Sequence, residues 1–168
     1  IYKSTITSCT VEANPLSVQC EDFGAQLSVP RFGHELHCMD SDENGLCKTV
    51  VAAGGYGADG WSIADLIDVE SGTVTPLSQN GVIAGVGGWK WVETSAGILS
   101  IGGTAEFGGL ADNPPRQVTI NNGTIVFEAL SSPEDGFLLR RTFHDLTLTP
   151  SGQVMVVGGI EKVYEIGR

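Results

Sequence analysis

Short apolar runs that end at paired glycines dominate the hydrophobic pattern of this chain. The clearest example lies between Lys48 and Leu77, where the sequence reads KTVVAAGGYGADGWSIADLIDVESGTVTPL. The run Val50–Ala53 stops at Gly54-Gly55, and a glycine-rich loop, a second apolar run, a tight turn and a third run follow. Short β-rich runs bounded by glycine turns are typical of an antiparallel meander. The pattern therefore predicts an all-β fold.

The same pattern recurs along the chain and predicts repeated units. Apolar runs end at glycine pairs in Val50–Gly55, Ile98–Gly103 and Val154–Gly159, so the first glycines are 48 and 56 residues apart. Further strands are predicted before each pair (31–39, 89–94, 141–149) and after each pair (65–69, 117–120, 162–166). Fourth strands are predicted at 73–77 and 124–130. Four short strands in a unit of about 50 residues are typical of β-propeller blades.

All four cysteines lie in the first third of the chain. Cys9 and Cys20 bracket a predicted loop that follows a strand at 4–11, and Cys38 and Cys47 flank the turn of a predicted hairpin. Pairing of nearest neighbours, Cys9–Cys20 and Cys38–Cys47, is the simplest of the three possible connectivities. Two disulfides are typical of oxidising compartments, so we expect a secreted, extracellular protein. Four reduced thiols in a cytosolic protein are the alternative.

The composition narrows the range of partners. The 168 residues carry a net charge of −11, with 9 Lys and Arg against 20 Asp and Glu. So acidic a chain repels phosphate backbones and anionic membrane surfaces, so neither nucleic acid nor a membrane is an expected partner. No apolar run approaches the roughly 20 residues that span a bilayer. No signal peptide opens the sequence, so we expect that one was removed or never existed.

The residues from 54 to 77 resemble a kelch repeat, with a glycine pair after a buried strand, then an aromatic residue, a strand, a turn and a fourth strand. Arg31-Phe32-Gly33-His34 and Arg141-Thr142-Phe143-His144 resemble the Arg-x-x-His opening of kelch first strands. In the second unit, Gly87-Gly88-Trp89-Lys90-Trp91 replaces that opening. The resemblance covers residues 24–167 and is to a divergent kelch type, similar to the propeller of galactose oxidase. Phe32-Gly33 also resembles the FG-GAP family.

The resemblance implies about three four-stranded antiparallel blades, a partial propeller or half of a six-bladed ring. The implied blades cover about 31–79, 82–132 and 137–168, and residues 24–30, with a strand at 25–29, form a displaced fourth strand. Residues 1–23 form an N-terminal strand and loop that contain a disulfide. Because propellers typically have 4–8 blades, we expect a homo-oligomer, or docking on the remaining blades of a longer chain.

The acidic turn at 40–45 is the candidate metal site. Asp40, Asp42 and Asn44 have the D-x-D-x-N-G spacing with which calcium loops bring side-chain oxygens to one cation. The closing acid is missing, because Val51 stands at the EF-hand position and Lys48 at the position of a shorter loop. We therefore expect an acidic hairpin tip that binds calcium weakly at most, and no other cofactor.

Aromatic residues and a sequon are the remaining candidates. Trp89 and Trp91 share one face of a predicted strand, and with Trp61 they are candidates for stacking on sugar rings; packing between blades is the alternative. His34 and His37 face opposite sides of a strand and are not expected to share a metal. The sequence Asn122-Gly123-Thr124 is an N-glycosylation sequon in a predicted turn.

The sequence contains no recognisable catalytic motif. It has no G-x-S-x-G, no H-E-x-x-H and no P-loop, and it lacks the Tyr-His dipeptide of the copper-radical oxidases. We therefore expect an extracellular non-enzymatic module that binds protein partners or itself through loops and edge strands. The alternatives are a fragment of a secreted enzyme similar to galactose oxidase, and a glycan-binding propeller.

Overall fold

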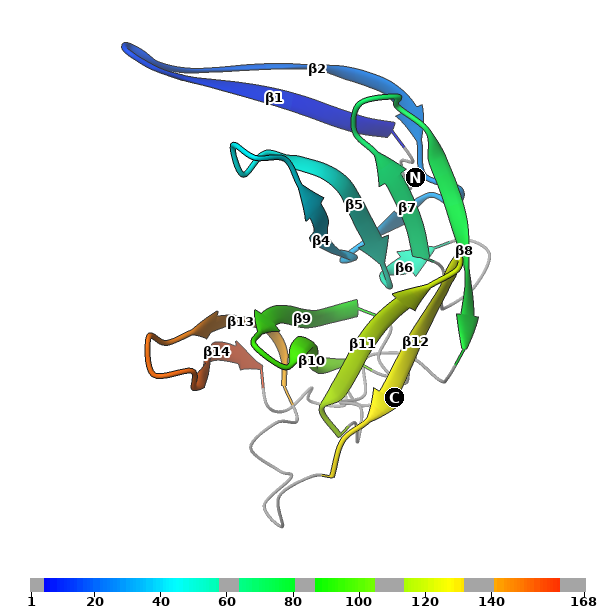
Figure 1. The fold of residues 1–168 in the computed structure, drawn as a ribbon, viewed down its shortest axis with the longest axis vertical. Coiled ribbons are helices and arrows are strands. Elements are labelled where there is room, and N and C mark those ends of the chain that lie inside the picture. Colours follow the sequence, from blue (N-terminus) through cyan, green and yellow to red (C-terminus); the bar gives the residue numbers. More distant parts are fainter. Residues whose placement is uncertain (1–4, 58–63, 81–86, 105–113, 132–140, 161–168) are drawn as a thin grey trace, which may run out of the picture.

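The computed structural model describes residues 5–57, 64–80, 87–104, 114–131 and 141–160, which form β-strands joined by turns and bends (Figure 1). The all-β class is therefore confirmed. The strands are β1 (Thr5–Ala13), β2 (Leu16–Gln26), β3 (Arg31–Phe32), β4 (Glu35–Ser41), β5 (Cys47–Ala53), β6 (Tyr56–Gly57), β7 (Ala64–Asp68), β8 (Val74–Asn80), β9 (Gly87–Thr94), β10 (Gly97–Thr104), β11 (Arg116–Asn121), β12 (Thr124–Ala129), β13 (Thr142–Leu148) and β14 (Val154–Ile160).

Strands β1 and β2 form a long hairpin that projects from the rest of the chain (Figure 1). The predicted loop between Cys9 and Cys20 is wrong, because the chain reverses at Asn14-Pro15 and the following residues pair directly back onto β1. The predicted strand at 25–29 is also wrong. Strand β2 ends at Gln26, and the chain bends at Ser28, whose backbone N–H donates to the carboxylate of Asp65.

The main sheet has eight strands in the order β4-β5-β7-β8-β12-β11-β10-β9. It consists of two antiparallel meanders, whose last strands, β8 and β12, pair in parallel with Thr124 opposite Ser78. The backbone N–H of Ser78 donates to the carbonyl oxygen of Gly123 at 2.9 Å. The expectation of separate four-stranded blades is therefore corrected: the outer strands satisfy each other's backbone groups, and the meanders merge into one mixed sheet.

The two ends of this sheet, β4 and β9, approach each other, so the sheet nearly closes into a barrel. Lys90 Nζ lies 3.0 Å from Glu35 Oε2, and the rings of His37 and Trp91 lie 5.8 Å apart, centroid to centroid. These two contacts are made by side chains, and one backbone hydrogen bond adds to them, from the N–H of Gly88 to the carbonyl oxygen of Gly33 at 3.4 Å. The other neighbours in the sheet are joined by ladders of backbone hydrogen bonds. The closure therefore depends on a few residues of β4 and β9.

The core fills the inside of this nearly closed sheet. Its centre is aromatic, with the ring centroids of Trp89 and Phe127 5.4 Å apart and those of Trp89 and Trp91 5.1 Å apart. Both meanders contribute to the cluster, which consists of Val51, Ala53, Ala64, Leu77, Trp89, Trp91, Val118, Ile125 and Phe127.

Strands β13 and β14 form a third, two-stranded unit, and β13 lies beside β9. The hydroxyl of Thr142 donates to the carbonyl oxygen of Gly88 at 3.3 Å, which ties the start of this unit to the second meander. The strand predicted at 162–166 lies outside the described residues.

Candidate functional site

The first strands of the three units begin with equivalent turns. Gly33, Gly88 and Phe143 have φ angles of 67°, 70° and 55°, in the left-handed region. The side chains that follow are His34, Trp89 and His144. Successive members of the series are 55 residues apart, the same separation as between the bonded residues Glu35 and Lys90.

The glycine pairs explain how consecutive units fit together. The first glycines, Gly54, Gly102 and Gly158, have φ angles of 70°, 76° and 70°. A Cβ on Gly54 would lie 2.5 Å from Nε1 of Trp89, and a Cβ on Gly102 would collide with the ring of His144. Each of these glycines therefore makes room for the first-strand side chain of the next unit. At Gly158, which is exposed, no atom of the described residues lies within 4 Å of such a Cβ.

Equivalent charged residues follow those side chains. Lys90 forms an ion pair with Glu35 of the preceding unit, and the third member of the series is Asp145. Burial raises the pKa of Glu35, the hydrogen bond and charge of Lys90 lower it, and the charge of Asp145 raises it further. The charges of Lys90 and Asp145 therefore both act on Glu35, and Lys90 neutralises part of the negative charge of the two carboxylates.

A groove of about 320 Å³ lies between the β1–β2 hairpin and the strands β4, β5 and β7. Among the described residues that line the groove, His34 is the one ionisable group, and burial lowers the pKa of His34, with a further contribution from the charge of Arg31. Burial therefore favours the neutral form of this histidine. Its lining is Thr5, Ile6, Thr7, Ser8, Phe23, Leu27, His34, Leu36, Val50, Ile67 and Val69.

A buried ion pair stands close to His34. The guanidinium of Arg31 donates to Asp65 Oδ2, which also accepts from the backbone N–H of Ser28 at 3.2 Å. Burial lowers the pKa of Arg31, and the charge and hydrogen bond of Asp65 oppose that shift. Sequence reasoning singled out Arg31 only as part of a motif and missed Asp65. An acid inside the apolar run Ala64–Ile67 was the available signal.

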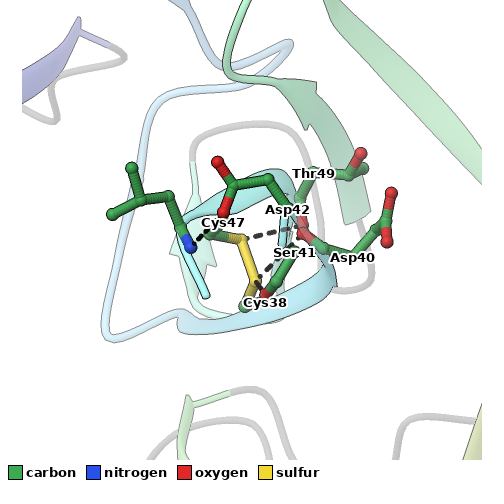
Figure 2. The surroundings of a disulfide bond; sticks show 7 residues. Cys38, Asp40, Ser41, Asp42, Cys47 and Thr49 are labelled. Atoms are coloured by element: carbon green, nitrogen blue, oxygen red, sulfur yellow. Dashed lines mark hydrogen bonds between the residues drawn. A yellow bond between two sulfur atoms is a disulfide. The ribbon is translucent and has the colours of Figure 1, made fainter. Parts of the chain in front are cut away.

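Both predicted disulfides are present. Cys9 and Cys20 lie directly opposite each other in the β1–β2 hairpin, with Cα atoms 4.1 Å apart. Cys38 and Cys47 join β4 to β5, with Cα atoms 5.7 Å apart, and Figure 2 shows this bond at the acidic turn. The pairing of nearest neighbours is therefore confirmed.

The acidic turn uses its carboxylate to hold its own backbone. Asp42 Oδ1 accepts the backbone N–H groups of Asn44 and Leu46 at 2.9 and 2.8 Å, and these bonds lower the pKa of Asp42, with that from Leu46 contributing most. Asp40 is exposed on β4. Nowhere in the part of the chain that the structure describes do three or more His, Cys, Asp or Glu side chains come together as a metal site would require.

The tryptophans of β9 are not available to a ligand. Trp89 is 3% exposed and Trp91 7% exposed, so their predicted role in stacking on sugars is wrong. The alternation of the sequence predicted that both side chains share one face of the strand, but it did not predict that this face is the covered one, which packs in the core. Trp61 lies outside the described residues. Asn122 is exposed in the β11–β12 turn with a φ angle of 50°, so the sequon is accessible.

No protein-family model matches this sequence, and no curated protein matches it. The resemblance to kelch repeats therefore stays a prediction. Within the described ranges, no helix is long and apolar enough to cross a membrane.

Proposed function

We propose that this chain is an extracellular, non-enzymatic interaction module of kelch-like units that binds protein partners, copies of itself included, through exposed strands. The observation that carries the proposal is the apolar surface of β13–β14. Phe143, Met155 and Val157 are 59%, 50% and 54% exposed, and they come from one small two-stranded element. Clustered exposed apolar side chains mark interaction sites, whereas single ones are ordinary.

The β1–β2 hairpin adds a second apolar surface. Val11 and Val18 are exposed and lie opposite each other near the tip, where Leu16 is also exposed. A two-stranded hairpin alone is marginally stable in water, and Cys9–Cys20 links its strands covalently. Stabilising a projecting apolar hairpin in this way favours a binding role.

Two further observations support the finer parts of the proposal. The two disulfides suit an oxidising compartment, from which we infer the extracellular location. The series of equivalent turns and glycine pairs, with a period of 55 residues in the first strands, supports kelch-like units. The function itself rests on the exposed strands, because a fold by itself does not specify a function.

Sedimentation equilibrium of the whole chain tests the proposal, with hydrogen exchange of β14 as a second readout. We expect association that protects the β14 amides as the concentration rises. Val157→Glu should weaken association at least tenfold, because it places a charge on the apolar surface. Ser151→Glu adds the same charge in the β13–β14 turn and should leave association unchanged. A monomer whose β14 amides exchange equally fast at every concentration would contradict the proposal.

A further inference from the structure

We propose that the outer edge of β2, over residues 16–22, binds an extended strand of a partner protein in which apolar residues alternate with lysine or arginine. The added strand extends the β1–β2 hairpin to a sheet of three strands. This inference rests on the proposed function and names the class of partner that the hairpin takes. Its evidence is the residue pattern of the hairpin, the direction of its backbone groups and its charge.

The two faces of the hairpin differ in composition. The register places three apolar pairs on one face, Cys9–Cys20, Val11–Val18 and Ala13–Leu16, and three polar pairs on the other, Ser8–Glu21, Thr10–Gln19 and Glu12–Ser17. Such strict alternation is typical of antiparallel strands with one face covered. Leu16 and Val18 are nevertheless 79% and 60% exposed. Within the described residues, the hairpin therefore has the composition of a covered sheet without the cover.

The backbone of β2 directs free hydrogen-bonding groups outward at the apolar positions. The Cα atoms of Cys9 and Cys20 lie 4.1 Å apart, close to the spacing of about 4.5 Å of a pair that shares no hydrogen bond, rather than about 5.5 Å. In such a pair the N–H and C=O groups point away from the facing strand. Because the pattern alternates, Val18 also presents its N–H and C=O groups at the outer edge of β2, and Val11 does so at the edge of β1.

The β2 edge is the more accessible of the two. The groove above β4, β5 and β7 is lined by all four residues from Thr5 to Ser8 of β1, but by none of residues 16–22. Figure 1 likewise shows β1 on the side of β4 and β5, with β2 beyond it. In the described part of the chain, β2 pairs only with β1. An incoming strand can therefore reach residues 16–22 of β2 without entering the groove.

This edge lacks the features that usually protect a strand from pairing with another chain. Exposed edges are commonly short, or they carry lysine, proline or a bulge. Strand β2 has 11 residues and contains neither lysine nor proline. The irregularity in the β1–β2 register lies between Thr5 and Thr7, beyond the segment 16–22. The edge is therefore long, regular and open to an added strand.

The charge of the hairpin selects the partner. Residues 5–26 include Glu12, Glu21 and Asp22 but no lysine or arginine. Glu12 accepts a hydrogen bond from the Ser17 hydroxyl and Asp22 accepts one from the N–H of Gly24, whereas Glu21 is exposed on the polar face. A second copy would bring further acidic charge, since each chain carries a net charge of −11. A basic strand therefore fits this edge better than a second copy does.

The two faces together define the pattern of the partner strand. Its residues opposite Leu16, Val18 and Cys20 extend the apolar face, and the residues between them lie on the polar face, where Glu21 stands. In this mode of recognition the main-chain hydrogen bonds supply affinity and alternate side chains supply specificity. Binding should weaken as salt rises, because salt screens the attraction between opposite charges.

A capped peptide of alternating lysine and valine, as long as the segment 16–22, is the probe for the whole chain. We expect it to slow hydrogen exchange of the Val18 and Cys20 amides and to bind more weakly as salt rises. A peptide with glutamate in place of lysine should bind at least tenfold more weakly. Equal binding of the two peptides would overturn the inference. Protection of these amides by a rising chain concentration without peptide would identify a second copy as the occupant and would also overturn it.

Proline substitution tests the edge. Val18→Pro removes an N–H that points outward and should weaken peptide binding about tenfold, since its ring also blocks the approach of the added strand. Val11→Pro is the matched control: Val11 faces Val18 across the hairpin, so the same change falls on the β1 edge. It should leave binding unchanged. Slow exchange of the Thr10 and Gln19 amides checks that both hairpins remain formed.

Equal effects of the two proline variants, or no effect of either, would overturn the inference. Self-association through β14 is measured separately, without peptide. A chain that associates through β14 but does not bind the lysine peptide would overturn this inference and leave the proposed function standing.

Discussion

Gly54 meets two requirements that no amino acid other than glycine can meet together. Its φ angle of 70° lies in the left-handed region, and its missing side chain leaves room for the indole of Trp89. An added methyl group would therefore cost energy through both backbone strain and a steric clash.

Gly54→Ala should destabilise the chain by about 2–5 kcal/mol, from a left-handed backbone cost of about 1–2 kcal/mol and overpacking of about 1–3 kcal/mol. The control is Gly72→Ala, which has a φ angle of 68° and open space, so that it carries only the first cost. Urea unfolding followed by circular dichroism measures both. Equal losses of unfolding free energy in the two variants would show that Trp89 moves aside without an energetic penalty.

His144 makes the stability depend on pH. Burial, and then the charge of Arg141, lowers the pKa of His144 to about 4. As the pH falls, His144 therefore takes up a proton near pH 6.5 in the unfolded chain but only near pH 4 in the folded chain. The stabilisation is complete above pH 6.5 and is lost as the pH falls toward 4, by up to about 3 kcal/mol.

The test compares unfolding free energies of the wild type and His144→Gln at pH 7.5 and pH 4.5. The wild type should lose more stability than the variant over this interval, because glutamine has no proton to gain. Parallel pH profiles would show that His144 titrates normally in the folded chain.

Residue-level features were predictable where the cause is local. Paired glycines indicate a turn of the backbone, and cysteines close in sequence indicate a disulfide, so the turns and both disulfides were predicted correctly. The burial of Trp89 and Trp91 was not predictable, since alternation gives a shared face without saying which side is covered. Asp65 was missed because its partner, Arg31, lies 34 residues away.

At the scale of elements, strand existence was predicted better than pairing. The hairpin formed by β4 and β5 was expected from an acidic turn between two apolar runs. The length of β2 was not, because Cys20 was assigned to a loop although Asn14-Pro15 already supplies the reversal. A turn of two residues leaves the chain free to pair at once, and this one does so.

The Cys9–Cys20 bond should matter most to its own hairpin. Replacing both cysteines by serine should weaken the β1–β2 pairing by about 2–3 kcal/mol, because the bond closes a short loop and the hairpin has few other contacts. Amide exchange around Val11 and Val18 should then become about 30- to 160-fold faster. The amides of β11 and β12 are the internal control, and equal acceleration there would mean that the bond supports the whole chain.

For the whole molecule, the sequence predicted units but not how they join. The apolar pattern shows which residues of a strand share a face, but it does not specify which strand lies beside it. The pairing of β8 with β12 connects residues far apart in sequence, and it turns two predicted blades into one sheet. The position of the hairpin above β4, β5 and β7 was equally unpredictable.

The shared core predicts that the two meanders unfold together. Trp89 lies against Gly54 of the first meander and Phe127 of the second, and Trp91 contacts His37 and Phe127. In a Trp61→Phe background, fluorescence reports only these two indoles. Its urea transition should therefore coincide with that of circular dichroism, as expected for a single cooperative unit.

The β8–β12 seam, the parallel pairing that joins the two meanders, offers a variant that tests this prediction directly. Ser78→Pro removes the N–H that donates to Gly123 and should cost about 2–3 kcal/mol, whereas Ser78→Ala keeps the N–H and should cost less than about 0.5 kcal/mol. If the seam couples the meanders, the two transitions should separate in Ser78→Pro alone. Separate transitions already in the wild type would mean that the meanders are independent units, held together by their side chains rather than by the sheet.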